Sequence, residues 1–245
     1  MLFTFIVLVL ILAAGLAVAD RFAASFAERK ISDRVAQQVA AQKATSEPPK
    51  VTIEGIPFLT QVLRGEYQQI RIELVNFSGP AGEGRTIQMK ELDATANDVR
   101  APLDTIRSGN GEVTAGSVTG AGLIDYAQIV QLVGQPGVKL SEQSGKLVGS
   151  APVQALGQTF RISATAALKV QGDLVQVSFS NVKADGLPDN ALVRGLVNTY
   201  VQKLAFNLRV PALPLGLKVK SVQPQADGLK ITAGASDVSL NSSGL

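Results

Sequence analysis

The residue types that carry most enzyme chemistry are missing from this chain. Among its 245 residues there is no histidine, no cysteine and no tryptophan. A Ser-His-Asp triad, an imidazole base, a thiol nucleophile and a disulfide are therefore excluded, and zinc loses its two usual ligands. Carboxylate chemistry, Ser-Lys chemistry and metals with oxygen ligands stay open.

The motifs that could supply such chemistry are weak. Ser180 and Lys183 have the spacing of a Ser-Lys hydrolase, but they follow an expected strand rather than open a helix, and the partner motifs are absent. Asp93, Asp98 and Asp104 do not have the spacing of a calcium loop. We expect a protein that is not an enzyme, with no metal and no cofactor; a hydrolase that uses Ser, Asp or Lys is the enzymatic alternative.

Composition indicates a folded chain with a sizeable core. Hydrophobic residues make up 46% and charged residues 18% of the sequence, as in globular domains. The net charge is only +3, without the clustered Lys and Arg of a nucleic-acid reader. Nucleic acid is therefore not an expected partner.

The residues from Met1 to Ala19 carry no charge. As a helix they reach ~28 Å, close to the hydrocarbon thickness of a bilayer. Two interpretations stay open: a signal peptide cut after Ala17-Val18-Ala19, or a retained anchor. No basic residue precedes the run; basic residues follow it, and the positive-inside rule alone would place them in the cytoplasm. We expect export and favour a retained anchor over cleavage.

Residues 20–50 are expected to form a helical spacer. Ala27, Ile31, Val35 and Val39 give a thin apolar stripe at helical spacing, and Pro48-Pro49 ends the helix. The segment could lift the following domain off the membrane. Alternatively, its basic residues could lie on anionic lipid head groups.

From Val51 onward the sequence alternates with the period of a β-strand. Apolar residues alternate with polar ones over 70–74 and over 160–170, and Asp227-Gly228 between two such runs predicts a hairpin. The apolar phase switches near Glu91, which predicts a β-bulge. Strands with one dry and one wet face pair in antiparallel sheets.

Two helices interrupt these strands. The first is capped by Asp125, with Gln128 completing a capping box, and ends at Gly134. The second runs from Pro188 and Asp189 to about Leu208 and has a broad apolar face. Because strands, short helix, strands, long helix and hairpin follow one another without a linker, we expect one α+β domain over 51–245.

Short blocks in a fixed order resemble the LmeA-like phospholipid-binding family of actinobacterial envelopes, long described as a domain of unknown function. The blocks are Asp20-Arg21, Gly55-x-Pro57-Phe58-Leu59-x-Gln61, Gly65-x-Tyr67, the run from Leu213 to Val222, and Asp227-Gly228-Leu229. The resemblance covers nearly the whole chain. The missing basic stretch before the apolar run is a departure that affects topology.

This resemblance implies a fold similar to tubular lipid-binding, BPI-like domains, in which a long curved antiparallel sheet wraps a long helix. It implies binding of phospholipids, phosphatidylinositol among them, and in some members a role in lipomannan elongation. An apolar groove can hold acyl chains without catalysis, since each buried CH₂ contributes ~0.8 kcal/mol.

The candidate groove lies between the second helix and the strand over 160–170, with small side chains leaving space for a ligand. Pro57 and the two residues after it could touch the membrane or gate the mouth, or Phe58 and Leu59 could enter the core. Tyr67 could bond a head group or sit at the rim of the domain. The candidate lipid-binding residues are Phe58, Leu59, Tyr67, Phe160, Ile162, Ala164, Ala166, Leu192, Leu196, Tyr200 and Leu204.

Two classes of function stay open, a lipid-binding protein and a structural protein. In the first, the protein holds or shuttles a phospholipid at the surface of the cytoplasmic membrane. In the second, the same fold has a filled core, because Ala164 and Ala166 simply let the helix pack closely. The protein would then be a tethered structural protein that supports an envelope glycosyltransferase or another membrane enzyme.

Overall fold

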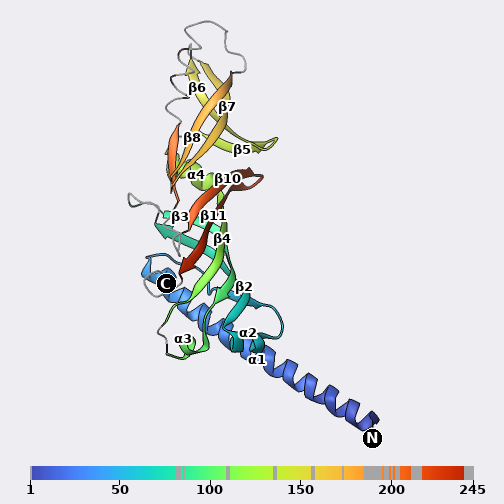
Figure 1. Ribbon diagram of the computed structural model, residues 1–245. Helices are drawn as coiled ribbons and strands as arrows, with labels where there is room; N and C mark the ends of the chain where they lie inside the picture. Colours follow the sequence, from blue (N-terminus) through green and yellow to red (C-terminus); the bar gives the residue numbers. More distant parts are fainter. Residues whose placement is uncertain are drawn as a thin grey trace.

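The computed structural model describes residues 2–80, 84, 86–108, 111–134, 137–155, 158–172, 174–184, 195, 199, 201, 205–210 and 217–239 (Figure 1). Within these ranges the helices are α1 (Leu2–Ala41), α2 (Phe58–Arg64), α3 (Leu103–Ser108) and α4 (Tyr126–Val133). The strands are β1 (Lys50–Glu54), β2 (Glu66–Pro80), β3 (Thr86–Arg100), β4 (Thr114–Asp125), β5 (Lys139–Gln143), β6 (Lys146–Ala155), β7 (Gln158–Gln171), β8 (Leu174–Ala184), β9 (Phe206–Arg209), β10 (Lys218–Gln225) and β11 (Gly228–Ser239).

The strands form two antiparallel sheets, so the α+β class is confirmed. Over the described residues, one sheet has the order β1-β2-β3-β4-β11-β10 and the other β5-β6-β7-β8-β9. The chain leaves the first sheet through α4, builds the second as a meander, and returns with the β10–β11 hairpin beside β4. The two sheets follow one another along the length of the molecule (Figure 1).

One hydrophobic cluster joins the two sheets. Leu74, Ile87 and Leu229 contribute from the first sheet, and Leu147 and Val175 from the second. The predicted alternation is visible in β7, where the side chains of Ile162, Ala164 and Ala166 are buried and those between them are more exposed. Inward-facing apolar side chains on every second residue are what hold such sheets together.

The hairpin predicted at Asp227-Gly228 is confirmed. Gln225 pairs with Gly228, and β11 continues in register along β4. A Cβ atom at Gly228 would collide with the backbone oxygen of Ile124, so glycine is the residue that lets these two strands approach.

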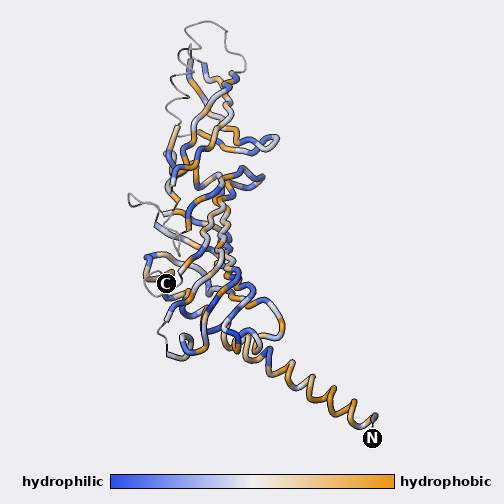
Figure 2. Tube along the Cα trace, in the orientation of Figure 1, coloured by the Kyte–Doolittle hydropathy of each residue, from blue (hydrophilic) through white to orange (hydrophobic). Residues whose placement is uncertain are grey.

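Helix α1 runs without a break from the apolar run into the folded domain. Side chains from Phe3 to Ala19 are exposed, and Asp20, the first charged residue, is also the first buried one. The apolar half projects away from the rest of the molecule, as Figures 1 and 2 show. This helix is long and apolar enough to cross a membrane.

The second half of α1 packs against the six-stranded sheet. Ala24 is 2% exposed and lies in a cluster with Ile53, Phe58 and Tyr67. The stripe at Ala27, Ile31, Val35 and Val39 contacts the same cluster and the larger core. Residues 20–41 therefore do not stand clear of the domain but pack along it with one face.

Hydrogen bonds fix this half of α1 and the segment after it. The Glu28 carboxylate accepts from the backbone N–H of Ile53 at 3.0 Å, and the Ser32 hydroxyl donates to the carbonyl oxygen of Pro49 at 2.5 Å. Beyond the helix, Thr45 and Ser78 exchange two backbone hydrogen bonds of 2.8 Å. The segment between the apolar run and β1 is therefore held to the rest of the domain by hydrogen bonds at Glu28, Ser32 and Thr45.

Two residues with positive φ lie across three neighbouring strands of the six-stranded sheet, an arrangement called the crease below. The register of β3 with β4, and of β4 with β11, places Gly116 between Asp98 and Asp237. Both aspartates have φ of 51°, in the left-handed region that Asp and Asn enter more readily than other side chains. Such residues inside strands bend the sheet locally.

The end of the expected second helix needs correction. The long second helix was expected to reach Leu208, but Phe206–Arg209 form strand β9, which pairs with β8. Leu208 and Val210 face the core while Asn207 is exposed, a period of two that suits the free edge of β8. Of the expected helix, Gly195, Thr199 and Val201 are described and helical.

The capping box expected at the start of α4 does not form. The helix has the expected bounds, and Gly134 closes it with φ of 67°, but Asp125 makes no side-chain cap hydrogen bond. Its carboxylate instead lies 3.2 Å from the Lys90 ammonium, and the Gln128 side chain accepts from the backbone N–H of Gln88. Contacts with β3 have replaced the local cap.

Candidate functional site

The block Gly55 to Tyr67 folds into a small platform around α2. Gly55 turns the chain after β1 with φ of 97°, and Gly65 ends α2 with φ of 67°. A side chain at Gly65 would also press on the backbone of Pro102, at 2.9 Å from its Cα. Gly65 therefore serves a turn that needs positive φ, where glycine is the favoured residue.

The inner face of α2 is held by Phe58 and Gln61. Phe58 is 4% exposed, and its ring centroid lies 6.2 Å from that of Tyr67. The buried Gln61 side chain donates to the carbonyl oxygen of Glu54 at 3.1 Å and accepts from the backbone N–H of Gln68 at 3.0 Å. Gln61 therefore joins the strands on both sides of the platform.

Asp20 connects this platform to α1. Its carboxylate accepts a hydrogen bond of 2.8 Å from the backbone N–H of Leu59, in the first turn of α2, where helix N–H groups otherwise lack partners. The Arg21 guanidinium lies 3.1 Å from the same carboxylate. The Asp-Arg pair at the end of the apolar run thus sets where α2 sits along α1.

The outer face of α2 is apolar and exposed. Ile56 and Leu63 are each 79% exposed and Leu59 is 39% exposed. Leu59 and Leu63 are four residues apart, so they share one face of the helix. Among the candidate residues in this block, only Leu59 is available at the surface, while Phe58 and Tyr67 lie in the core beneath it.

Burial also determines the protonation state of the Tyr67 phenol. It is 7% exposed, and burial raises the pKa of its phenol above the ordinary value. The hydroxyl therefore stays protonated at neutral pH. This position suits a packing residue under α2 better than a residue that meets a lipid head group.

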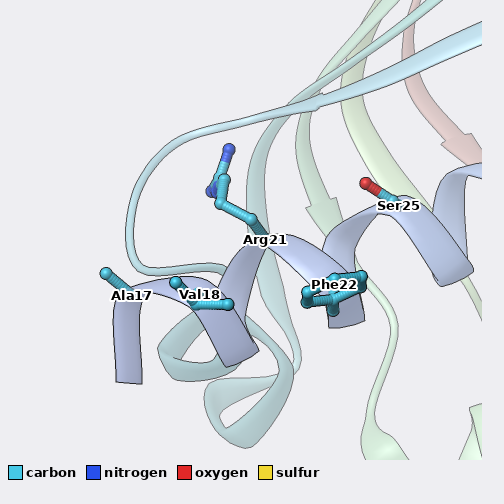
Figure 3. Close-up of a pocket in the computed structure, with 5 residues that line it drawn as sticks. All are labelled: Ala17, Val18, Arg21, Phe22 and Ser25. Carbon is cyan, nitrogen blue, oxygen red and sulfur yellow. The ribbon is translucent and has the colours of Figure 1, made fainter. Parts of the chain in front are cut away.

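An open groove lies on α1 beside this region (Figure 3). Its volume is about 380 Å³, and its lining comes from α1 alone: Ala17, Val18, Arg21, Phe22 and Ser25. Because one helix supplies every wall, the groove is a depression on a surface rather than an enclosed cavity. It spans the point where the apolar run meets the first charged residues.

The second group of candidate residues lies on β7, in the other sheet. Ile162 and Ala164 are 2% and 4% exposed and pack with Val201, which belongs to the helical segment facing them. Ala166 lies in the core that joins the sheets, and Phe160 is half-buried. Contact between β7 and the second helix is therefore present at Val201, although the expected helix residues Leu192, Leu196, Tyr200 and Leu204 lie outside the described residues.

The candidate residues that the structure describes lie in two separate places. Phe58, Leu59 and Tyr67 lie beside α1, and the residues of β7 lie in the sheet farther from the apolar run (Figure 1). Sequence reasoning missed Asp20, Gln61 and Leu63. The signal for Asp20 was available, because it is the first charged residue after nineteen uncharged ones.

The possible catalytic residues are dispersed in the part of the chain that the structure describes. Ser180 and Lys183 are exposed on β8, on either side of an irregularity in its pairing with β7. No group of three or more acidic side chains able to hold a metal ion occurs among the described residues. The features that stand out are apolar faces rather than polar clusters.

A family model named LmeA-like phospholipid-binding matches residues 18–234. The chain belongs to this family. No curated protein and no solved structure matches the chain significantly. The matched region begins at Val18, so the LmeA-like unit includes the half of α1 that carries Asp20 and packs on the sheet. Phospholipid binding is therefore the general function that the family assigns.

Proposed function

We propose that this LmeA-like protein is anchored by α1 and holds or transfers a phospholipid whose acyl chains lie against the inner face of β7. The family match supports phospholipid as the ligand. The apolar row on β7 supports this position for the acyl chains. Phe160 and Leu168 in the row are only half-buried, while Ile162, Ala164 and Ala166 between them are buried. An elongated apolar row open at its ends suits acyl chains.

The cellular setting belongs to the same proposal. We place the protein in the cell envelope at the outer face of the cytoplasmic membrane, with a lipid of the phosphatidylinositol type as its cargo and an envelope enzyme that builds lipoglycans as its partner. The support is the family resemblance together with an apolar run long enough to cross a bilayer. Carrying lipid needs no catalytic residue, in line with a chain that has no histidine or cysteine.

The competing function is a tethered scaffold with a filled core. The close cluster of Ile162, Ala164 and Val201 favours it, since all three are at most 4% exposed. A core this dense leaves space for lipid only if the second helix can separate from β7. The two functions differ in whether extra volume on β7 displaces lipid.

Substituting Ala164 tests the proposal directly. Ala164→Phe places a ring on the inner face of β7, and Ala167→Phe places the same ring on the exposed face three residues away. We expect full-length Ala164→Phe, purified in detergent, to lose most of the phospholipid found by extraction and mass spectrometry. Ala167→Phe should retain it. Lipid that merely surrounds the apolar run is present in both variants, so it does not affect the difference in lipid content between them.

Overpacking of a core can cost about 1–3 kcal/mol, so Ala164→Phe could fail to fold. Phe160→Ser, at the half-buried end of the row, then replaces it, with the exposed neighbour Arg161→Ser as its control. Equal lipid content in folded inner-face and outer-face variants would reject the carrier and leave the scaffold. Offering phosphatidylinositol against phosphatidylethanolamine to the wild-type chain tests the head group separately.

A further inference from the structure

We propose that Ile56, Leu59 and Leu63 form an apolar foot that enters the interfacial layer of the bilayer crossed by α1. The occupant of this surface is the membrane itself, at the boundary between head groups and acyl chains. The foot would make the domain sit directly on the membrane, at a fixed height and orientation, rather than swing on its anchor.

The height of the foot coincides with the end of the apolar run. The backbone N–H of Leu59 lies 2.8 Å from the carboxylate of Asp20, so Leu59 stands level with the first charged residue of α1. The uncharged residues before Asp20 span ~28 Å as a helix, about the thickness of the hydrocarbon layer. When that run fills the hydrocarbon, Leu59 and its neighbours reach the interface.

The platform presents these apolar side chains outward by construction. Phe58 and Gln61 turn inward and are held by packing and by two hydrogen bonds, which leaves Leu59 and Leu63 on the opposite face. Ile56, immediately before the helix, extends the same exposed surface with 79% exposure. In water an apolar face held this rigidly has no partner within the described chain.

The charges around the foot fit a lipid surface. Arg64 is exposed, and so is Arg21, whose guanidinium also lies 3.1 Å from the Asp20 carboxylate; both can reach lipid phosphates. The acidic side chains near the foot are the buried Asp20, and Glu54 and Glu66 in the flanking strands. Leu59 is itself bonded to Asp20, the residue that directly follows the apolar run, and the groove of Ala17, Val18 and Phe22 on α1 adds apolar surface at the same end of that run (Figure 3). Continuity with the apolar run favours the bilayer over a protein partner as the occupant.

This inference rests on α1 being retained in a membrane and is independent of any lipid cargo on β7. The two proposals can therefore fail separately. Loss of cargo in Ala164→Phe says nothing about the foot, and a foot that stays in water says nothing about cargo.

A fluorescent reporter tests the position of the foot. The chain has no cysteine, so Leu63→Cys and the control Lys146→Cys, exposed on β6, each give one labelling site. Full-length protein carrying a polarity-sensitive probe is reconstituted in vesicles of phosphatidylcholine and phosphatidylglycerol. At position 63 we expect emission at shorter wavelength, quenching by a spin-labelled lipid and loss of quenching by iodide. At position 146 iodide alone should quench.

A probe at position 63 that behaves like the one at 146 would overturn the proposal. Shielding of the probe that grows with protein concentration in detergent would also overturn it, because a second copy of the chain would then cover the foot.

Hydrogen exchange measures the same contact without a label. The double substitution Ile56→Ser with Leu63→Ser should abolish the extra protection that vesicles give α2. The exposed Val75→Ser on β2, about 30 Å along the strand, should leave it unchanged.

Discussion

At the scale of single residues, Asp20 and the block from Gly55 to Tyr67 hold one short helix, α2, in place. Gly55, Gly65 and Gln61 set the conformation around α2, and Asp20 fixes its distance along α1. Their types follow from geometry, since two of these positions need positive φ and the other two need a buried side chain that bonds to the backbone. These four residues of the motif therefore have structural roles, and they hold the exposed Leu59 in place.

Gln61→Leu tests this role. The substitution keeps the size of the side chain but replaces its amide by an apolar group, which leaves the Glu54 carbonyl and the Gln68 N–H without their partner. An unsatisfied buried group costs ~1–3 kcal/mol, so we expect about 2 kcal/mol of destabilisation and a Tm lower by several degrees. Thermal unfolding of the full chain in detergent measures it. The exposed Gln68→Ala keeps the backbone bonds and serves as control; equal Tm values for both variants would contradict the role.

At the scale of elements, alternation and turn residues predicted the strands that have one dry face. β7, the β10–β11 hairpin and the bounds of α4 follow directly from periodicity, Gly and Asp. The end of the second helix did not, because Val201 and Leu208 also fit a helical repeat, and only pairing with the edge of β8 decides for a strand. Periodicity could not predict the hydrogen bond between Asp20 and Leu59 either, because that contact depends on how α1 crosses the sheet.

The phase switch near Glu91 shows the same limit. Burial does change phase there, as the sequence indicated, but the expected bulge is absent: Val75 faces Glu91 and Phe77 faces Met89 in one unbroken register. Between them Asn76 takes φ of 52°, so both strands turn their apolar side over together. Sequence alone locates the switch but cannot tell a left-handed residue from an inserted one.

The crease at Asp98 gives a prediction for the sheet. Asp98 is exposed with φ of 51°, a conformation that costs an ordinary L-residue ~1–2 kcal/mol and a β-branched one more. Asp98→Val should therefore destabilise the fold by about 2 kcal/mol, whereas Asp98→Gly should be close to neutral because relief of strain offsets the added chain entropy. Chemical unfolding compares both with Glu91→Val, an exposed position of the same strand. Equal stability of the valine variants would rule out the strained conformation.

At the scale of the whole molecule, α1 joins the apolar run and the domain in one continuous helix. The helix passes unbroken from side chains that are exposed to side chains that pack on the sheet, and the change falls at Asp20, where charge begins. A flexible tether would leave the domain free to tumble above the membrane. If the apolar run is retained in a membrane, as we propose, a continuous helix would instead transmit its tilt to the packed domain and hold the foot on α2 at a fixed height.

This continuity leads us to expect that the run from Met1 to Ala19 stays attached in the mature protein. Cleavage after Ala17-Val18-Ala19 needs an extended segment at the cut, but here residues on both sides are helical, and Asp20 is buried with its carboxylate bonded to Leu59. After an alkaline carbonate wash the protein should remain in the membrane pellet. Digests of that pellet should contain peptides that cross the Ala19–Asp20 bond. A soluble fraction whose chains begin at Asp20 would show that the run is removed, and the domain would then reach the bilayer through α2 alone, a binding that three apolar side chains make weak and reversible.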